Sequence, residues 1–125
     1  MTSPEFFETI GSRGFYRPVA AMVTFEQAIE MVAQAMKYAR DRGLADLLAN
    51  TNGLTGFPQP STFARYSLAV KWAEAAGGAL RVALVTRPEI IDPQKIGVLM
   101  AQNRGVNGDV FTNETDALAW LDARI

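Results

Sequence analysis

The sequence predicts an α/β fold, with a single sheet of four to five strands and about four helices. Three observations carry this prediction. From Thr24 onwards, short apolar segments alternate with helical ones, an order that builds right-handed crossovers and a mostly parallel sheet. Two further apolar segments with a turn between them precede Thr24, which indicates an antiparallel hairpin. The length of 125 residues, without repeats or linker-like tracts, predicts one domain over 1–125.

The hairpin strands are predicted at Phe6–Ile10 and Phe15–Met22. The four residues 11–14 between them, Gly-Ser-Arg-Gly, are turn-prone. Pro18 has no amide hydrogen to donate to a sheet ladder. We therefore expect the second segment to be an edge strand, or to be bulged at Pro18.

The first helix is predicted to begin after Thr24, which stands three residues before Gln27. This T-x-x-Q spacing is typical of a capping box. Gly43 provides a left-handed stop. The apolar residues that recur at helical spacing, and so predict the buried stripe, are Phe25, Ile29, Val32, Met36 and Ala39.

A buried strand is predicted at Asp46–Asn50, followed by a polar bend and a second helix. Pro60 suits the entry to that helix, Ser61 or Thr62 suits its cap, and Ala76 is its expected end. Spacing predicts that its core-facing residues are Phe63, Tyr66, Val70 and Ala73.

The clearest strand is Leu80–Thr86, because it is β-branched and almost uncharged, as expected in the middle of a parallel sheet. Asp92 is predicted to cap a third helix, with Pro93 at its first position and Gly105 as its stop. The chain is then predicted to end with a strand at Asp109–Phe111 and a helix capped by Thr112 or Asn113, with Ala117, Leu118, Trp120 and Leu121 as its apolar residues.

Composition excludes several function classes. The chain has no cysteine and no histidine, which removes thiolate chemistry, the commonest proton-transfer group near neutral pH and the usual zinc ligands. We therefore expect no catalytic residues, no metal site and no cofactor. The net charge of −1 provides no field to attract nucleic acid. Because no apolar stretch is long enough for a membrane span and no leader pattern is present, a cytoplasmic location is expected.

The candidate binding site lies where the predicted central strands end. In a parallel sheet these ends share one edge, and ligands collect there. An anion could meet free amides at this edge, with Arg65 or Arg87 nearby; alternatively, these residues only cap helices and satisfy the bend. The predicted binding residues are Thr51, Asn52, Phe57, Ser61, Thr62, Arg65, Thr86 and Arg87.

Three segments, LLANTNGLTGFPQPSTFARY, VALVTRPE and VFTNETDALAWL, resemble the SpoIIAA-like proteins of the STAS superfamily. These are small bacterial domains related to anti-sigma-factor antagonists. The similarity covers about Val23 to Leu121 and implies a sheet covered by helices, no catalysis and a regulatory or protein-binding role. The antagonists are phosphorylated on a serine at the start of the second helix, so Ser61 and Thr62 are the matching positions. Their Asp-Ser-Ser-Gly-Leu signature is absent here.

Two function hypotheses follow. The favoured one is a non-enzymatic module that binds a protein partner, including a second copy of itself as a homodimer, through the bend and the second helix, where Phe57 and Tyr66 can anchor an interface. The alternative is a carrier of a small apolar or anionic molecule, or of a lipid, a reading that the similarity of some SpoIIAA-like structures to the CRAL-TRIO fold supports. The residues expected to line its pocket are Met22, Phe25, Met31, Met36, Met100 and Trp120. An enzyme is the least favoured hypothesis.

Overall fold

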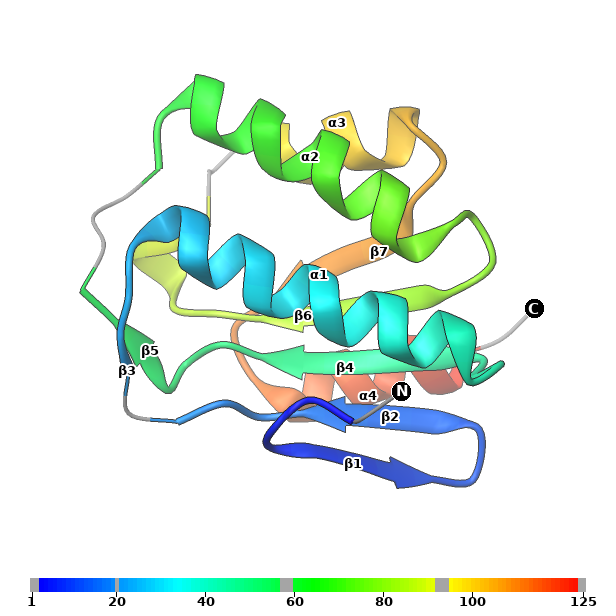
Figure 1. Ribbon diagram of the computed structural model, residues 1–125. Coiled ribbons are helices and arrows are strands. Elements are labelled where there is room, and N and C mark those ends of the chain that lie inside the picture. The colour runs from blue at the N-terminus through cyan, green and yellow to red at the C-terminus, as the bar shows by residue number, and fades with distance from the viewer. Residues whose placement is uncertain (1–2, 20, 57–59, 92–94, 124–125) are drawn as a thin grey trace.

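The fold is organised around a five-stranded mixed sheet in the order β1-β2-β4-β6-β7, and the described residues form four α-helices on its two sides (Figure 1). The structure is a computed structural model, which describes residues 3–19, 21–56, 60–91 and 95–123. The predicted α/β class, with an antiparallel hairpin followed by parallel strands, is confirmed.

The elements follow the predicted order. Their bounds are β1 Phe7–Ile10, β2 Arg13–Tyr16, β3 Ala21–Met22, α1 Phe25–Asp41, β4 Asp46–Asn50, β5 Leu54–Thr55, α2 Thr62–Ala76, β6 Arg81–Val85, a 3₁₀ turn η1 Pro88–Ile90, α3 Ile96–Asn103, β7 Asn107–Phe111 and α4 Glu114–Asp122. The short strands β3 and β5 pair with each other in parallel, outside the main sheet.

The position of β2 corrects one prediction. β2 is antiparallel to β1 and parallel to β4, so it lies inside the sheet and is not an edge strand. Pro18 lies two residues beyond its end and therefore removes no ladder hydrogen bond. The predicted segment Phe15–Met22 divides into the end of β2 and the separate strand β3. The edge strand of the hairpin is β1, and homodimerisation through it stays a prediction.

Helix α1 begins as predicted. The Thr24 hydroxyl accepts a hydrogen bond from the Gln27 amide at 3.1 Å, and the Gln27 side chain accepts one from the Thr24 amide at 2.9 Å. Gly43 adopts the predicted left-handed conformation, with φ +71°. Ile29, Val32, Met36 and Ala39 of the predicted stripe are buried, and Phe25 is partly buried.

Helix α2 has the predicted bounds, with Ser61 as its N-cap and left-handed Gly77 at its end. Its predicted inward face is wrong for Phe63 and Tyr66, whereas Val70 and Ala73 are partly buried and Ala73 packs against a buried cluster. Phe63 and Tyr66 are 78% and 44% exposed. The buried residues of the helix are Ala69, Trp72 and Ala76. The reason is that α2 packs mainly against its neighbours α1 and α3, and small alanines let helices approach closely.

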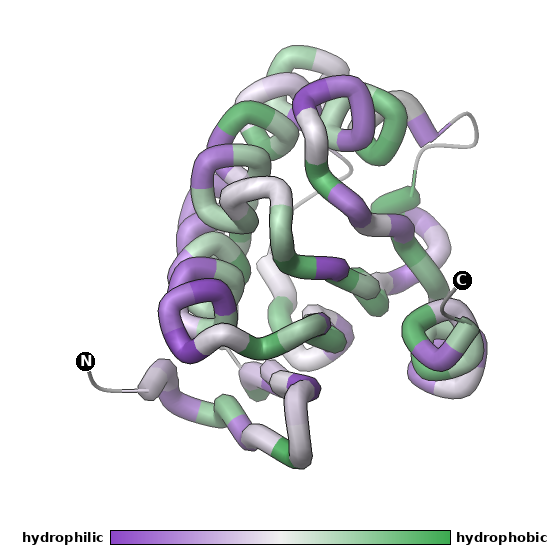
Figure 2. The backbone as a smooth tube through the Cα atoms, turned by 90° about the vertical axis from the view of Figure 1, so that its right-hand side faces the viewer, coloured by the Kyte–Doolittle hydropathy of each residue, from purple (hydrophilic) through white to green (hydrophobic). Residues whose placement is uncertain are grey.

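The helices are divided unequally between the two faces of the sheet. α1, α2 and α3 lie on one face, and α4 lies on the other (Figure 1). In the view of Figure 2, α4 is seen end-on beside the C-terminal label, and the strands separate it from the other helices. α1 packs on β4 and β2, α3 packs on β7, and α2 bridges α1 and α3.

The C-terminal third of the chain tests the predicted ends of the last two helices. The predicted cap Asp92 and Pro93 lie outside the described residues, and α3 begins at Ile96. Gly105 has φ +92° after α3, as expected for a helix stop. The Asn113 side chain caps α4 by accepting a hydrogen bond from the Asp116 amide at 2.8 Å. Within the described ranges, no helix is long and apolar enough to cross a membrane.

Candidate functional site

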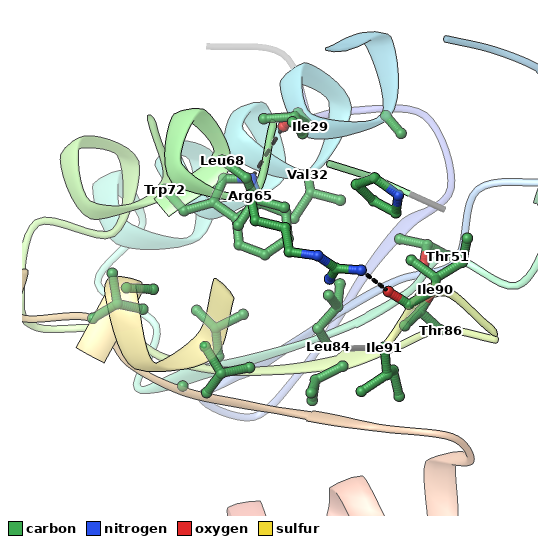
Figure 3. A pocket seen from close by; sticks show the side chains of 18 of the residues that line it. Ile29, Val32, Thr51, Arg65, Leu68, Trp72, Leu84, Thr86, Ile90 and Ile91 are labelled. Carbon is green, nitrogen blue, oxygen red and sulfur yellow. Dashed lines mark hydrogen bonds between the residues drawn. The ribbon is translucent and has the colours of Figure 1, made fainter. Parts of the chain in front are cut away.

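The candidate site is a pocket of about 110 Å³ on the three-helix face of the sheet (Figure 3). It exists because α2 rests on α1 and α3, leaving space between α2 and the strands β6 and β7. α1 contributes Ile29, Val32 and Met36; α2 contributes Arg65, Leu68 and Trp72; β6 and β7 contribute Val82, Leu84 and Val110; α3 contributes Val98 and Ala101.

The pocket surface is mostly apolar. Only five of the 22 described residues that line it have polar side chains, namely Thr51, Arg65, Thr86, Lys95 and Asp109. Such a combination, an apolar concavity with a few polar groups, is typical of small-molecule sites.

Trp72 fixes the underside of α2 above the pocket. Its indole nitrogen donates a hydrogen bond to the Ile29 carbonyl of α1 at 3.2 Å, so the buried polar atom of this large side chain is satisfied. Figure 3 shows this bond between the two helices. The indole thereby connects α2 to α1 and forms part of the apolar wall.

Arg65 is the most unusual polar group of the pocket. It is half-buried, and its Nη2 donates to the carbonyl oxygen of Ile90 at 2.9 Å. Figure 3 shows the side chain extending from α2 across the pocket to Ile90. Within the described part of the chain, the guanidinium forms no ion pair with a carboxylate. Lys95, by contrast, has Asp109 as a partner, with Nζ 3.0 Å from Oδ1.

Thr51 and Thr86 follow the carboxyl ends of β4 and β6 and are 8% and 6% exposed. The Thr51 hydroxyl donates to the Val85 carbonyl at 3.0 Å, so it serves the structure of the strand end. The Thr86 hydroxyl has no hydrogen-bond partner among the described residues, although its backbone amide donates to Phe111. In Figure 3 both threonines lie at the same end of the pocket as Ile90.

The structure therefore brings together three of the predicted binding residues, Thr51, Arg65 and Thr86. The other described ones do not line the pocket: Asn52 is exposed, Ser61 caps α2 by accepting from the Ala64 amide at 3.1 Å, Thr62 is exposed, and Arg87 pairs with Glu89 at 3.4 Å. Phe57 lies outside the described residues. The predicted phosphorylation of Ser61 or Thr62 stays a prediction.

Of the residues proposed to line a carrier pocket, only Phe25 and Met36 do so. Met22 is 84% exposed, and Trp120 packs against Phe111 on the α4 face. Sequence reasoning missed Leu68 and Trp72. A signal for both was present, because Arg65, Leu68 and Trp72 stand at i, i+3 and i+7 and therefore share one face of α2.

A second polar cluster lies at the carboxyl ends of the strands, on the α4 side. Arg17 binds Glu114 through two hydrogen bonds of 2.8 and 2.9 Å, and Asn50 donates to the same carboxylate at 2.7 Å. The hydrogen bond from Arg17, followed by that from Asn50, lowers the pKa of Glu114 despite its partial burial. This carboxylate therefore already has its charge balanced by Arg17 and three hydrogen bonds within the protein.

A search of the described residues finds no group of three or more acidic side chains placed to hold a metal ion. Comparisons of the chain with family models, with curated proteins and with solved structures found no match. The resemblance to SpoIIAA-like proteins accordingly stays a prediction, and the function is argued from the pocket itself.

Proposed function

We propose that this protein is a small-molecule-binding domain, which takes a small, largely apolar molecule into the pocket beneath α2. The observation that carries the proposal is the pocket of about 110 Å³ with mostly apolar walls. Protein interiors are usually packed without such voids. An apolar cavity of about 150 Å³ is known to bind benzene, so a ring or a short chain is the matching size of occupant.

Binding is testable through Trp72, which lines the pocket, after Trp120→Phe removes the second tryptophan from the opposite face. We expect a saturable change in Trp72 fluorescence when this protein is titrated with benzene or with 1-hexanol. Native mass spectrometry of freshly purified protein then reports any ligand that co-purifies.

A matched pair of variants on α3 tests where the probe binds. Val98 lines the pocket, whereas its neighbour Leu99 is exposed and does not. Val98→Phe fills the pocket and is expected to weaken probe binding by about tenfold or more, a loss of one or two well-packed contacts. Leu99→Phe is expected to leave it unchanged. The proposal fails if neither probe binds, or if Val98→Phe binds as well as Leu99→Phe.

A second candidate, protein binding through the outer face of α2, is supported by a different observation. Phe63 and Tyr66 stand one turn apart and are exposed, and Arg104 holds the Tyr66 hydroxyl through a 2.8 Å hydrogen bond. Aromatic side chains presented in this way are typical anchors of interfaces. If a second copy of the chain is the partner, sedimentation velocity should show a dimer that Phe63→Ser converts to monomer; a monomeric native protein would contradict self-association.

A further inference from the structure

We propose that the occupant of the pocket is a small monocarboxylate: an apolar ring or short chain that carries one carboxylate, bound by Arg65 and Thr86. This inference rests on the proposed function and specifies the chemistry of its ligand. It depends on two polar groups that the protein itself leaves incompletely satisfied.

The first group is the Arg65 guanidinium, which is always charged and has five N–H donors. Among the described residues, the guanidinium forms one hydrogen bond, to the neutral carbonyl of Ile90. Arg13, which is also partly buried, has a carboxylate partner in Asp46 at 2.8 Å. Partial burial of a cation without a counter-charge is unfavourable, so the pocket favours an anion beside Arg65.

The charges of the described lining residues favour a ligand with a single negative charge. The described charged residues that line it are Arg65, Lys95 and Asp109, which sum to +1. Lys95 and Asp109 already pair with each other. One negative charge on the ligand balances these described residues, and the guanidinium fork matches the two oxygens of a carboxylate. A dianion would bring excess charge close to Asp109.

The second group is the Thr86 hydroxyl. Thr86 lines the same pocket and is only 6% exposed. No described residue forms a hydrogen bond with its hydroxyl. A carboxylate oxygen would accept its hydrogen. The Thr51 hydroxyl cannot donate to the carboxylate in this way, because it already donates its hydrogen to the Val85 carbonyl.

The apolar part of the ligand then has a defined direction. In Figure 3, Thr86 and Ile90 lie at one end of the pocket, while Trp72 and Leu68 of α2 lie toward the other. With its carboxylate near Arg65 and Thr86, the ligand places its ring or chain along the wall that Trp72, Leu68 and Val32 form.

Matched probe pairs test this inference in the Trp120→Phe protein. The pairs are 3-phenylpropanoate with 3-phenylpropanamide, and hexanoate with hexanamide, which share shape and differ in charge. By Trp72 fluorescence and calorimetry we expect each carboxylate to bind about tenfold or more tightly than its amide, as charged hydrogen bonds do. Arg65→Gln should abolish this preference and leave amide binding within about threefold, because one neutral contact changes affinity little.

Two further variants complete the design. Arg42→Gln removes an equal charge from an exposed residue that stacks over Tyr38, away from the pocket lining, and should keep the preference. Thr86→Val keeps the side-chain shape and should reduce the preference about threefold to tenfold, the effect of one lost donor. If Arg65→Gln does not fold, Thr86→Val decides the matter.

The outcomes separate the two proposals. Amides that bind as tightly as carboxylates overturn the monocarboxylate inference while the apolar binding function stands. A carboxylate preference that persists unchanged in both Arg65→Gln and Thr86→Val also overturns it. If no member of either pair binds and benzene and 1-hexanol do not bind either, the proposed function itself fails.

Discussion

The two faces of the sheet carry helices in different ways. On one face, α4 packs directly on β4, β6 and β7, around the fully buried residues Leu48, Ala83, Val85, Ala117 and Leu121. On the other face, three helices share the sheet, and the middle one, α2, is supported by its neighbours rather than by the strands. α4 contacts the strands directly, whereas α2 is held away from the strands by α1 and α3, and the pocket lies beneath it.

The two faces also differ in how the charged side chains near the carboxyl ends of the strands are paired. On the α4 side, Glu114 is held by Arg17 and Asn50, so donors and acceptors are matched within the protein. On the pocket side, Arg65 has a neutral carbonyl as its partner. Glu114 therefore has charged and neutral donors within the protein, whereas Arg65 has a neutral acceptor on the side where we propose that a ligand binds.

The largest expected effect compares leucines on the two faces. Leu48 lies in the α4 core and is fully buried, whereas Leu84 is partly buried and lines the pocket. We expect Leu48→Ala to lower the free energy of unfolding by about 3–4 kcal/mol, because it creates a new cavity in a closed core. Leu84→Ala enlarges a space that already exists, and should cost about 1–2 kcal/mol.

Urea denaturation of both variants against the native protein measures this difference, with equal m-values as the check that the same surface is exposed on unfolding. Equal losses for Leu48→Ala and Leu84→Ala would mean that the pocket face is as tightly packed as the α4 face. Repeating the Leu84→Ala measurement with 3-phenylpropanoate added links the packing comparison to binding, since a ligand of the native state adds stability.

The features that sequence reasoning predicted correctly are those with local causes. The Thr24 capping box, the Ser61 and Asn113 caps and the Gly43 stop each depend on residues within one helical turn. The parallel order of the sheet follows from alternating strands and helices. These features require no knowledge of what lies across the fold.

The errors concern neighbours that are distant in sequence. α2 is apolar on both sides, so Phe63 and Tyr66 or Leu68 and Trp72 could equally have faced inward; the positions of α1 and α3 decided in favour of Trp72. The pocket depends on the spacing between those helices, which no local pattern encodes. That Thr51 and Thr86 lie together could be predicted, because the carboxyl ends of parallel strands share one edge.

The smallest expected effect concerns the ion pair of Arg17 and Glu114 on the α4 side of the sheet. The pKa of Glu114 is lowered from its ordinary value of 4.5, chiefly by the hydrogen bond from Arg17. Between the folded and unfolded values the unfolded chain binds more protons, so stability rises with pH there. The contribution of Glu114 is therefore complete above about pH 4.5, and is lost as pH falls from there through the lowered folded value. Because Arg17 is partly exposed, this contribution should be about 1 kcal/mol or less.

Glu114→Gln isolates this contribution, since its amide does not titrate. The difference in unfolding free energy between the native protein and Glu114→Gln should be largest near pH 7 and should shrink as the pH is lowered below about 4.5. A difference that is constant with pH, or that grows in acid, would contradict the lowered pKa.

Arg17→Gln tests the cause of the lowered pKa. Because it removes the stronger of the two donors, the pKa of Glu114 should return toward its ordinary value, which NMR can measure. The hydrogen bond from Asn50 should keep part of the shift. Neither change should alter ligand binding on the opposite face, because Glu114 and Arg17 do not line the pocket.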